Sequence, residues 1–126
     1  MSHRIVVADD DRHIVLAVGM KLSRAGFRVE TVGDGLAAWH AISRESPDLL
    51  ITDFQMPRMN GLELCRQVRS NPATSQLPVL MLTAKGFEMD ESTVRAELGV
   101  IKILAKPFSP RDLLQIVEET LAAVVV

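Results

Sequence analysis

Aspartates follow two short apolar segments of this chain, at the points where those segments end. Three of them occupy positions 9–11 after the apolar run 5–8, and Asp53 follows the run 48–52. Two carboxylates about 4 Å apart repel each other by about 4 kcal/mol at an effective dielectric constant near 20, so a group of them requires protonation or a cation. Because no histidine or cysteine completes a ligand set with them, the oxygen atoms favour a hard ion, Mg²⁺ above Zn²⁺.

Two further polar residues end apolar runs downstream. Thr83 closes the run 78–83, and Lys106 comes shortly after the run 101–104. Carboxylate, hydroxyl, ammonium and Mg²⁺ are the groups that proteins use for phosphoryl transfer. In that chemistry Asp53 is the nucleophile that forms an aspartyl phosphate. Lys106 and the cation offset charge on the phosphoryl oxygens, and Thr83 donates a hydrogen bond to one of them.

The aspartates, Thr83 and Lys106 can meet only if the strands that precede them lie side by side. Five short β-branched or aliphatic runs alternate with longer stretches that have helical spacing or helix start and stop signals. Such alternation predicts an α/β fold, a doubly wound (βα)5 domain with a parallel sheet and helices on both faces. In such a sheet, sites form where the carboxyl ends of the strands meet. The expected strands span 5–8, 27–31, 48–52, 78–83 and 101–104, and the expected helices span 12–25, 36–44, 62–69, 88–98 and 110 to the chain end.

Composition bounds the class of protein. The 126 residues predict a single domain over 1–126, and 48% hydrophobic with 24% charged residues is an ordinary globular balance. A net charge of −2 gives no electrostatic basis for nucleic acid or an anionic membrane as a main partner. Cys65 is the single cysteine, and no apolar run approaches the roughly 20 residues of a membrane helix. We therefore expect a soluble, cytoplasmic protein with no direct nucleic-acid or membrane partner.

Four motifs in order resemble the receiver domain of two-component response regulators, of the chemotaxis-receiver-like kind. One is an acid pair after the first strand, and the second is an aspartate that heads a Met-Pro…Gly loop after the third. The others are Thr-Ala after the fourth strand and Lys-Pro-Phe after the fifth, so that the resemblance covers essentially the whole chain. The matching residues are Asp9-Asp10, Asp53-Phe54-Gln55-Met56-Pro57-Arg58-Met59-Asn60-Gly61, Thr83-Ala84 and Lys106-Pro107-Phe108.

The resemblance implies a role for each acidic position. Asp53 is expected to be the phosphoacceptor, which receives its phosphoryl group from a phosphohistidine on a histidine kinase or histidine phosphotransfer protein. Mg²⁺ is expected at Asp9, Asp10, Asp53 and the backbone carbonyl of Gln55. Asp10 is expected to bind the ion directly, and Asp9 through water.

The resemblance also implies the remaining site residues and the fold. Thr83 and Lys106 are expected to bind the phosphoryl group, and the Lys106–Pro107 peptide bond is expected to be cis. The fold is expected to be flavodoxin-like, with strand order 2-1-3-4-5. A receiver is a regulatory domain rather than an enzyme. It catalyses only its own phosphorylation and dephosphorylation, and it changes its surface for a downstream protein or its own effector domain.

Two places depart from the family pattern. The position three residues before the lysine is often a switching Tyr or Phe, and here it is Ile103, so that relay is absent. The two positions after Gly99 are often acidic or small, and here they are Val100 and Ile101. They predict a more apolar face on the fourth helix, fifth strand and fifth helix. We expect a partner or a homodimer to use that face.

Two other functions stay open at this point. A degenerate receiver could act as a binding module without phosphorylation, which Ile103 keeps in play. An aspartyl-nucleophile phosphohydrolase would also combine a carboxylate with Mg²⁺, but such enzymes carry the nucleophile after the first strand and usually a cap domain. Two residues near the site have structural explanations instead, because Asp11 and Ser109 stand where helix N-caps are expected.

Overall fold

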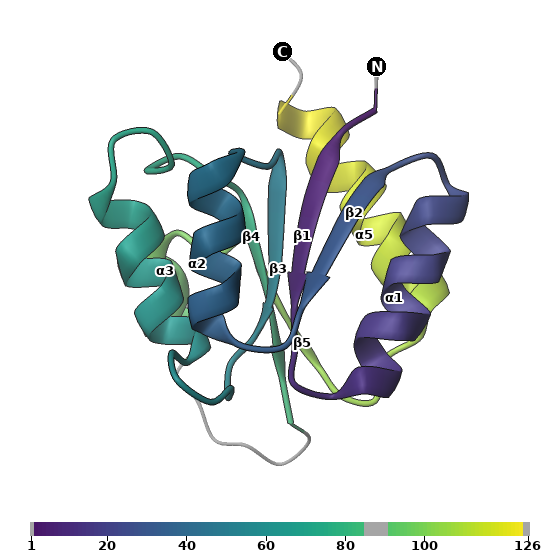
Figure 1. Cartoon of the computed structure of the whole chain (residues 1–126), viewed down its shortest axis with the longest axis horizontal. Coiled ribbons are helices and arrows are strands. Elements are labelled where there is room, and N and C mark those ends of the chain that lie inside the picture. The colour runs from purple at the N-terminus through teal and green to yellow at the C-terminus, as the bar shows by residue number, and fades with distance from the viewer. Residues whose placement is uncertain (1, 85–90, 125–126) are drawn as a thin grey trace.

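The computed structural model describes residues 2–84 and 91–124. Strands and helices alternate along these residues, and each strand is followed by a helix (Figure 1). The strands are β1 (Arg4–Ala8), β2 (Arg28–Val32), β3 (Leu49–Asp53), β4 (Val79–Thr83) and β5 (Lys102–Ala105), and the helices are α1 (Arg12–Arg24), α2 (Gly35–Arg44), α3 (Gly61–Ser70), α4 (Glu91–Leu98) and α5 (Pro110–Val124).

The strands form one parallel sheet in the order β2-β1-β3-β4-β5. β1 lies between β2 and β3, and its last residue, Ala8, is opposite Val32 on one side and Thr52 on the other. The carboxyl ends of these strands are therefore level. The strand order reverses between β1 and β3, which is the place where doubly wound sheets bind their ligands. Both β1 and β3 run directly into aspartates there.

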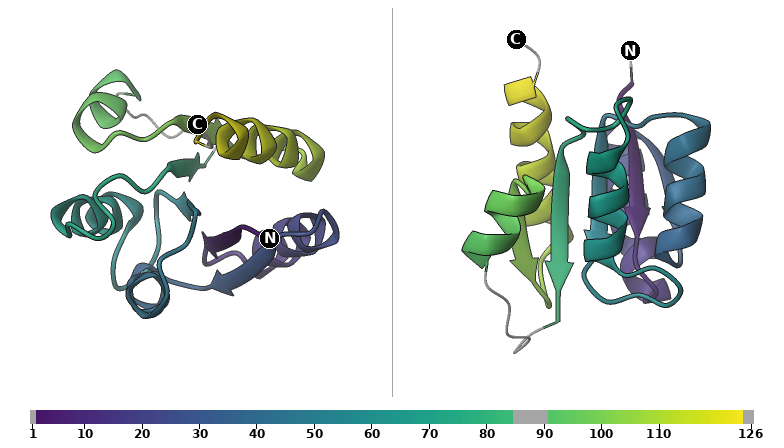
Figure 2. Two further views of the ribbon diagram at one scale, coloured as in Figure 1. Left: turned by 90° about the horizontal axis from the view of Figure 1, so that it is seen from above. Right: turned by 90° about the vertical axis from the view of Figure 1, so that its left-hand side faces the viewer.

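Each face of the sheet has its own core. Val6 and Ala8 of β1 belong to the core beneath α2, α3 and α4, whereas Ile5 and Val7 belong to the core beneath α1 and α5. Figures 1 and 2 show the same two layers, with α2, α3 and α4 on one side of the sheet and α1 and α5 on the other. Every residue of β1, β3 and β4 is buried, which explains why these strands are almost continuously apolar.

Side-chain caps define where the helices begin. Asp11 accepts hydrogen bonds from two backbone N–H groups at the start of α1, and Ser109 does the same for α5, so both expected caps are confirmed. Asn60 and Glu63 form a reciprocal capping box at the start of α3. The sequence contains this Asn-x-x-Glu signal, which places the helix start one residue before the expected 62–69.

The expected fold class and strand order are confirmed. No strand begins or ends more than about one residue from the expected position. Of the expected helix 88–98, residues 88–90 lie outside the described residues, and α4 covers the rest. No helix in the described part of the chain is long and apolar enough to cross a membrane.

One expectation about the surface was wrong. Val100 was expected to add to an apolar outer face, but it is only 3% exposed and belongs to the core beneath α4. The backbone N–H of the next residue, Ile101, donates to the carbonyl of Val79 at 2.9 Å, which draws the turn after α4 onto the sheet. Ile101 itself is 39% exposed and does contribute to the outer face.

Candidate functional site

Three aspartates meet at the carboxyl end of the sheet. Asp53 is the last residue of β3, and Asp9 and Asp10 directly follow β1. One carboxylate oxygen of each lies within 4.8 Å of the other two. Asp9 and Asp53 are almost completely buried, whereas Asp10 is exposed. The structure therefore forms a cluster with two aspartates inside and one at its mouth.

Lys106 is the cation that faces this cluster. It follows β5, and its Nζ atom lies 2.9 Å from Oδ2 of Asp9 and 3.3 Å from Oδ1 of Asp53. Its side chain is 20% exposed, and its peptide bond to Pro107 is cis, as expected. The ammonium group bridges carboxylates from two strands and offsets part of their mutual repulsion.

Burial and charge shift the pKa values of these groups together. Burial, with the nearby Asp9 carboxylate, raises the pKa of Asp53 to about 6, although Lys106 acts in the opposite direction. Burial also raises the pKa of Asp9, although the backbone N–H of Asp11 and the Lys106 ammonium oppose it. Burial alone would lower the pKa of Lys106, but the two carboxylates outweigh it and raise that pKa. Asp53 is thus mostly ionised at neutral pH, at an electrostatic cost.

The donor set fits a small divalent cation. Oδ1 of Asp9 accepts a hydrogen bond from the backbone N–H of Asp11 at 2.9 Å. Oδ2 is buried, and among the described residues its one polar contact is the Lys106 ammonium. Three carboxylates against one ammonium leave excess negative charge. Oxygen donors in that arrangement suit Mg²⁺.

Thr83 and Gln55 stand at the same edge of the sheet. Thr83 ends β4 and is buried, and its carbonyl accepts a hydrogen bond from the backbone N–H of Lys106 at 2.7 Å. Gln55 is exposed and lies two residues beyond Asp53, in the loop that leads to α3. Thr83 thus ends the strand beside β3, and Gln55 lies in the loop that follows Asp53, and neither side chain forms a hydrogen bond to the three described aspartates.

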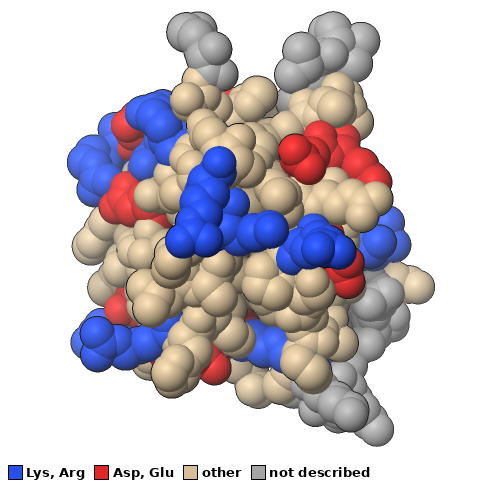
Figure 3. Space-filling view, turned by 90° about the vertical axis from the view of Figure 1, so that its right-hand side faces the viewer, with Lys and Arg blue, Asp and Glu red and all other residues tan. Residues whose placement is uncertain are grey.

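The face covered by α1 and α5 borders the site and carries many positive charges, as Figure 3 shows. α1 contains Arg12, Lys21 and Arg24 and no acidic residue. Leu16 and Met20 on the same helix are the most exposed large hydrophobic side chains of the described residues, at 65% and 48%. The helix therefore presents an apolar stripe between basic ends.

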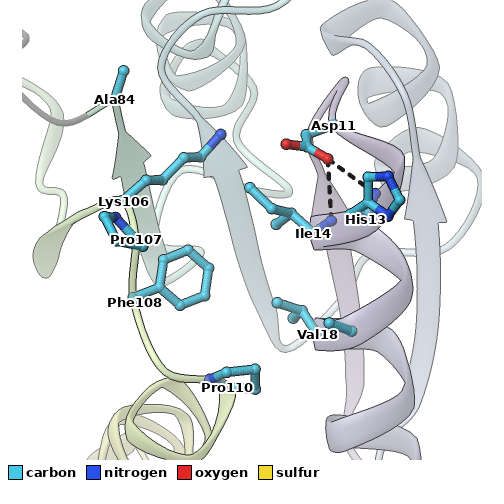
Figure 4. Close-up of a pocket in the computed structure, with 10 residues that line it drawn as sticks. Asp11, His13, Ile14, Val18, Ala84, Lys106, Pro107, Phe108 and Pro110 are labelled. Atoms are coloured by element: carbon cyan, nitrogen blue, oxygen red, sulfur yellow. Dashed lines mark hydrogen bonds between the residues drawn. The ribbon is translucent and has the colours of Figure 1, made fainter.

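A hollow of about 470 Å³ lies between α1 and the segment after β5 (Figure 4). The ring of Phe108 faces Ile14 and Val18 across it, and Lys106 extends from its upper rim toward the acidic cluster. No sequence pattern pointed to this hollow, because it depends on α1 lying against a loop some 90 residues later in the chain.

Comparison with known proteins identifies the family. The model of the response regulator receiver domain matches residues 5–118. The chain belongs to the receiver domain family. The match spans all five strands, except Arg4, and most of the last helix, so the resemblance seen in the motifs is confirmed for the receiver as a whole.

Curated relatives are response regulators. The receiver is 39% identical over 112 residues to the alkaline phosphatase synthesis transcriptional regulatory protein PhoP of Bacillus subtilis. These 112 residues cover 89% of this chain and 45% of PhoP. It is 41% identical over 114 residues to the response regulator MprA of Mycobacterium ulcerans, which covers 90% of this chain and 48% of MprA. The chain thus spans about half the length of these relatives.

Solved receiver structures have the same fold. The chemotaxis response regulator CheY4 of Vibrio cholerae superimposes with a TM-score of 0.86 at 29% identity, over 94% of this chain and 98% of CheY4. A CheY-like receiver domain protein of Methanospirillum hungatei gives a TM-score of 0.87 at 27% identity, over 98% of this chain and 96% of that protein.

Proposed function

We propose that this receiver takes a phosphoryl group onto Asp53 from a phosphohistidine of a histidine kinase or histidine phosphotransfer protein, in a Mg²⁺-dependent reaction. The observation that carries the proposal is the position of Asp53, which is buried within 4.8 Å of two other carboxylates and 3.3 Å from Lys106. A buried carboxylate in that setting is costly for a purely structural role, because burial and like charge raise its pKa to about 6.

The transfer itself is a displacement at phosphorus. A carboxylate oxygen of Asp53 attacks the phosphorus atom, and the bond between phosphorus and the imidazole nitrogen breaks. Its electron pair returns to the imidazole, and Asp53 is left as an acyl phosphate. Hydrolysis reverses the modification when water attacks phosphorus, which releases inorganic phosphate and restores the carboxylate. The receiver catalyses only these two reactions of its own side chain.

Each surrounding residue has a defined task. Asp9, Asp10, Asp53 and the backbone carbonyl of Gln55 are proposed to hold Mg²⁺, with Asp10 a direct ligand and Asp9 bound through water. When bound, the ion supplies positive charge that offsets the carboxylates and the phosphoryl oxygens.

The other two site residues contact the phosphoryl group. The Lys106 ammonium exchanges its contact with Asp53 for a phosphoryl oxygen, and the Thr83 hydroxyl donates to another. Thr83 ends β4 and Lys106 directly follows the neighbouring strand β5, so a change at the site reaches the outer strand of the sheet.

The phosphodonor is proposed to dock on α1 and on the hollow beside it. Both border the acidic cluster, because α1 begins at Arg12 and the hollow shares Lys106 with the site. The apolar stripe of Leu16 and Met20 between basic residues suits a donor helix with apolar and acidic side chains. Such a helix would hold its phosphohistidine over Asp53.

The downstream partner is proposed to bind a different face from the phosphodonor, the α4-β5-α5 face. The response-regulator relatives are about twice as long as this chain, which is consistent with an effector domain or a separate protein as the downstream partner. The exposed Ile101 supports a partner or homodimer contact on the α4-β5-α5 face. The family and the single buried thiol, Cys65, support a cytoplasmic location.

Intact-mass measurement after incubation with acetyl phosphate and Mg²⁺ tests the proposal, with Asp53→Asn as the control. One phosphoryl group that appears only in the wild type, requires Mg²⁺ and persists long enough to be measured supports the receiver reaction. Catalytic turnover of many phosphate esters would show a phosphohydrolase instead. A wild type that stays unmodified and binds no Mg²⁺ would show a binding module, the alternative that Ile103 keeps open.

A further inference from the structure

The loop between Asp53 and α3 contains a tight turn at Arg58. Arg58 has a φ of 68° and is the one non-glycine residue with a positive φ among the described residues. The backbone N–H of Met59 donates to the carbonyl of Pro57 at 2.8 Å, so Arg58 is the centre of a three-residue γ-turn. An L-residue in this region is strained and persists only where its surroundings hold it there.

The side chain of Arg58 is held by the start of α2. Its guanidinium donates to Oδ2 of Asp34 at 2.6 Å. The other oxygen of Asp34 accepts the backbone N–H of Ala37 at 2.7 Å and caps α2. The Ala37 hydrogen bond, with the charge of Arg58, holds the pKa of Asp34 below its usual value. One carboxylate therefore joins the cap of α2 to the turn at Arg58.

The backbone of the same loop packs closely against two helix starts. A Cβ on Gly35, the first residue of α2, would lie 2.0 Å from the carbonyl oxygen of Met59. A Cβ on Gly61, the first residue of α3, would lie 2.3 Å from the carbonyl oxygen of Asp53. Loop 54–60 is thus confined at both ends of its path, and Gln55 lies within it.

We propose that Arg58 and Asp34 are positioning residues for the magnesium site, since their ion pair fixes the turn that orients the Gln55 carbonyl. This inference rests on the proposed function, because it assumes that Gln55 contributes a ligand. The ion pair joins the loop after β3 to the loop after β2, which also pack against each other at Met59 and Gly35. Mg²⁺ affinity therefore depends on a residue that does not contact the ion.

A plain surface ion pair is the competing explanation, because the Arg58 side chain is 67% exposed. Such a pair stabilises the fold slightly and has no effect on a site several residues away. A positioning role and a plain surface ion pair predict different Mg²⁺ affinities for Arg58→Gly. Glycine accepts the positive φ without strain, so the turn costs less while the ion pair is lost.

The test compares Arg58→Gly, Arg58→Met and Arg58→Lys with Arg66→Met, which removes another exposed arginine, on α3. Mg²⁺ dissociation constants from calorimetry and hydrogen exchange of the Met59 amide in metal-free protein are measured for each. We expect Mg²⁺ binding about two- to five-fold weaker in the glycine and methionine variants, the range for a pair of this exposure. We also expect faster Met59 exchange in both, with Arg58→Lys restoring most of both readouts and Arg66→Met leaving both unchanged.

Asp34→Asn completes the design, because asparagine keeps the capping oxygen for α2 and loses the charge. It is expected to weaken Mg²⁺ binding as much as Arg58→Met does. The variant that combines Asp34→Asn with Arg58→Met should have no lower Mg²⁺ affinity than either single variant. Wild-type affinity and wild-type exchange in Arg58→Gly and Arg58→Met would overturn the inference. Failure of the proposed function is a separate result, since the wild type itself would then bind no Mg²⁺.

Discussion

Replacing Asp53 by asparagine is expected to stabilise the metal-free receiver at pH 8, although it removes the proposed phosphoacceptor. The pKa of Asp53 is raised from 3.8 to about 6, chiefly by burial and then by Asp9. At 1.36 kcal/mol per pKa unit the shift corresponds to about 3 kcal/mol of destabilisation once the group is ionised in both states. Asparagine removes that charge at nearly constant shape.

The full amount is an upper limit. The buried amide of asparagine needs hydrogen-bond partners of its own, and Lys106 loses one of its two anionic contacts. We therefore expect a gain of about 1–2 kcal/mol in the free energy of unfolding at pH 8. The raised pKa means that the folded state binds more protons than the unfolded state, so stability from this group is complete below pH 3.8 and is lost as the pH rises through about 6.

Urea unfolding in EDTA at a series of pH values measures this directly. The advantage of Asp53→Asn over the wild type should be largest at pH 8 and should vanish near pH 4. Glu118→Gln, an exposed acid on α5, serves as the matched control and should change stability by less than about 0.5 kcal/mol at either pH. The reasoning is refuted if Asp53→Asn is no more stable than the wild type at pH 8, or if its advantage does not depend on pH.

Three further predictions concern other buried groups. Arg4→Met should lower the free energy of unfolding by about 2–4 kcal/mol in urea titrations, because the carbonyls of Ala41 and Glu45 lose the buried guanidinium that donates to them at 3.0 and 3.1 Å. Glu30 keeps its ion pair with Arg44, and an effect below 1 kcal/mol would contradict the prediction. Gly35→Ala should lower the free energy of unfolding by about 1–3 kcal/mol and weaken Mg²⁺ binding, because its methyl group would meet the carbonyl of Met59. Unchanged Mg²⁺ affinity would show that the position of loop 54–60 does not affect the site. Cys65 should react with a thiol reagent at pH 8 only at the rate of unfolding, because burial raises its pKa to about 12, so rapid labelling of folded protein would disprove its burial.

The main lines of the fold follow from the sequence because each rests on a local pattern. The uninterrupted apolar runs that became β1, β3 and β4 can be buried on both faces only within a parallel sheet covered by helices. The carboxyl ends of such strands share one edge, which is why Asp9, Asp53 and Lys106 could be grouped before their distances were known. The helix caps at Asp11 and Ser109 were also predicted correctly, because a cap depends on residues that are close together in the sequence.

The sequence was less informative where the outcome depends on contacts between distant segments. Val100 appeared exposed by family comparison, but the turn after α4 folds it into the core. The ion pair between Arg58 and Asp34 joins two loops 24 residues apart, and neither residue has a pattern that points to the other. The hollow beside Phe108 likewise exists only once α1 and the loop after β5 are packed together. Such features depend on tertiary geometry rather than on periodicity.

The most direct test of the account is to locate the modified residue by tandem mass spectrometry after treatment with acetyl phosphate, with and without Mg²⁺. The account predicts one phosphoryl group on the peptide that contains Asp53, present only with Mg²⁺, and strongly reduced in Lys106→Met. It predicts no modification elsewhere in the Asp53→Asn variant. Phosphorylation that maps to another residue, or that reaches the same level on Asp53 without Mg²⁺, would contradict the central claim that this acidic cluster is a magnesium-dependent phosphoacceptor site.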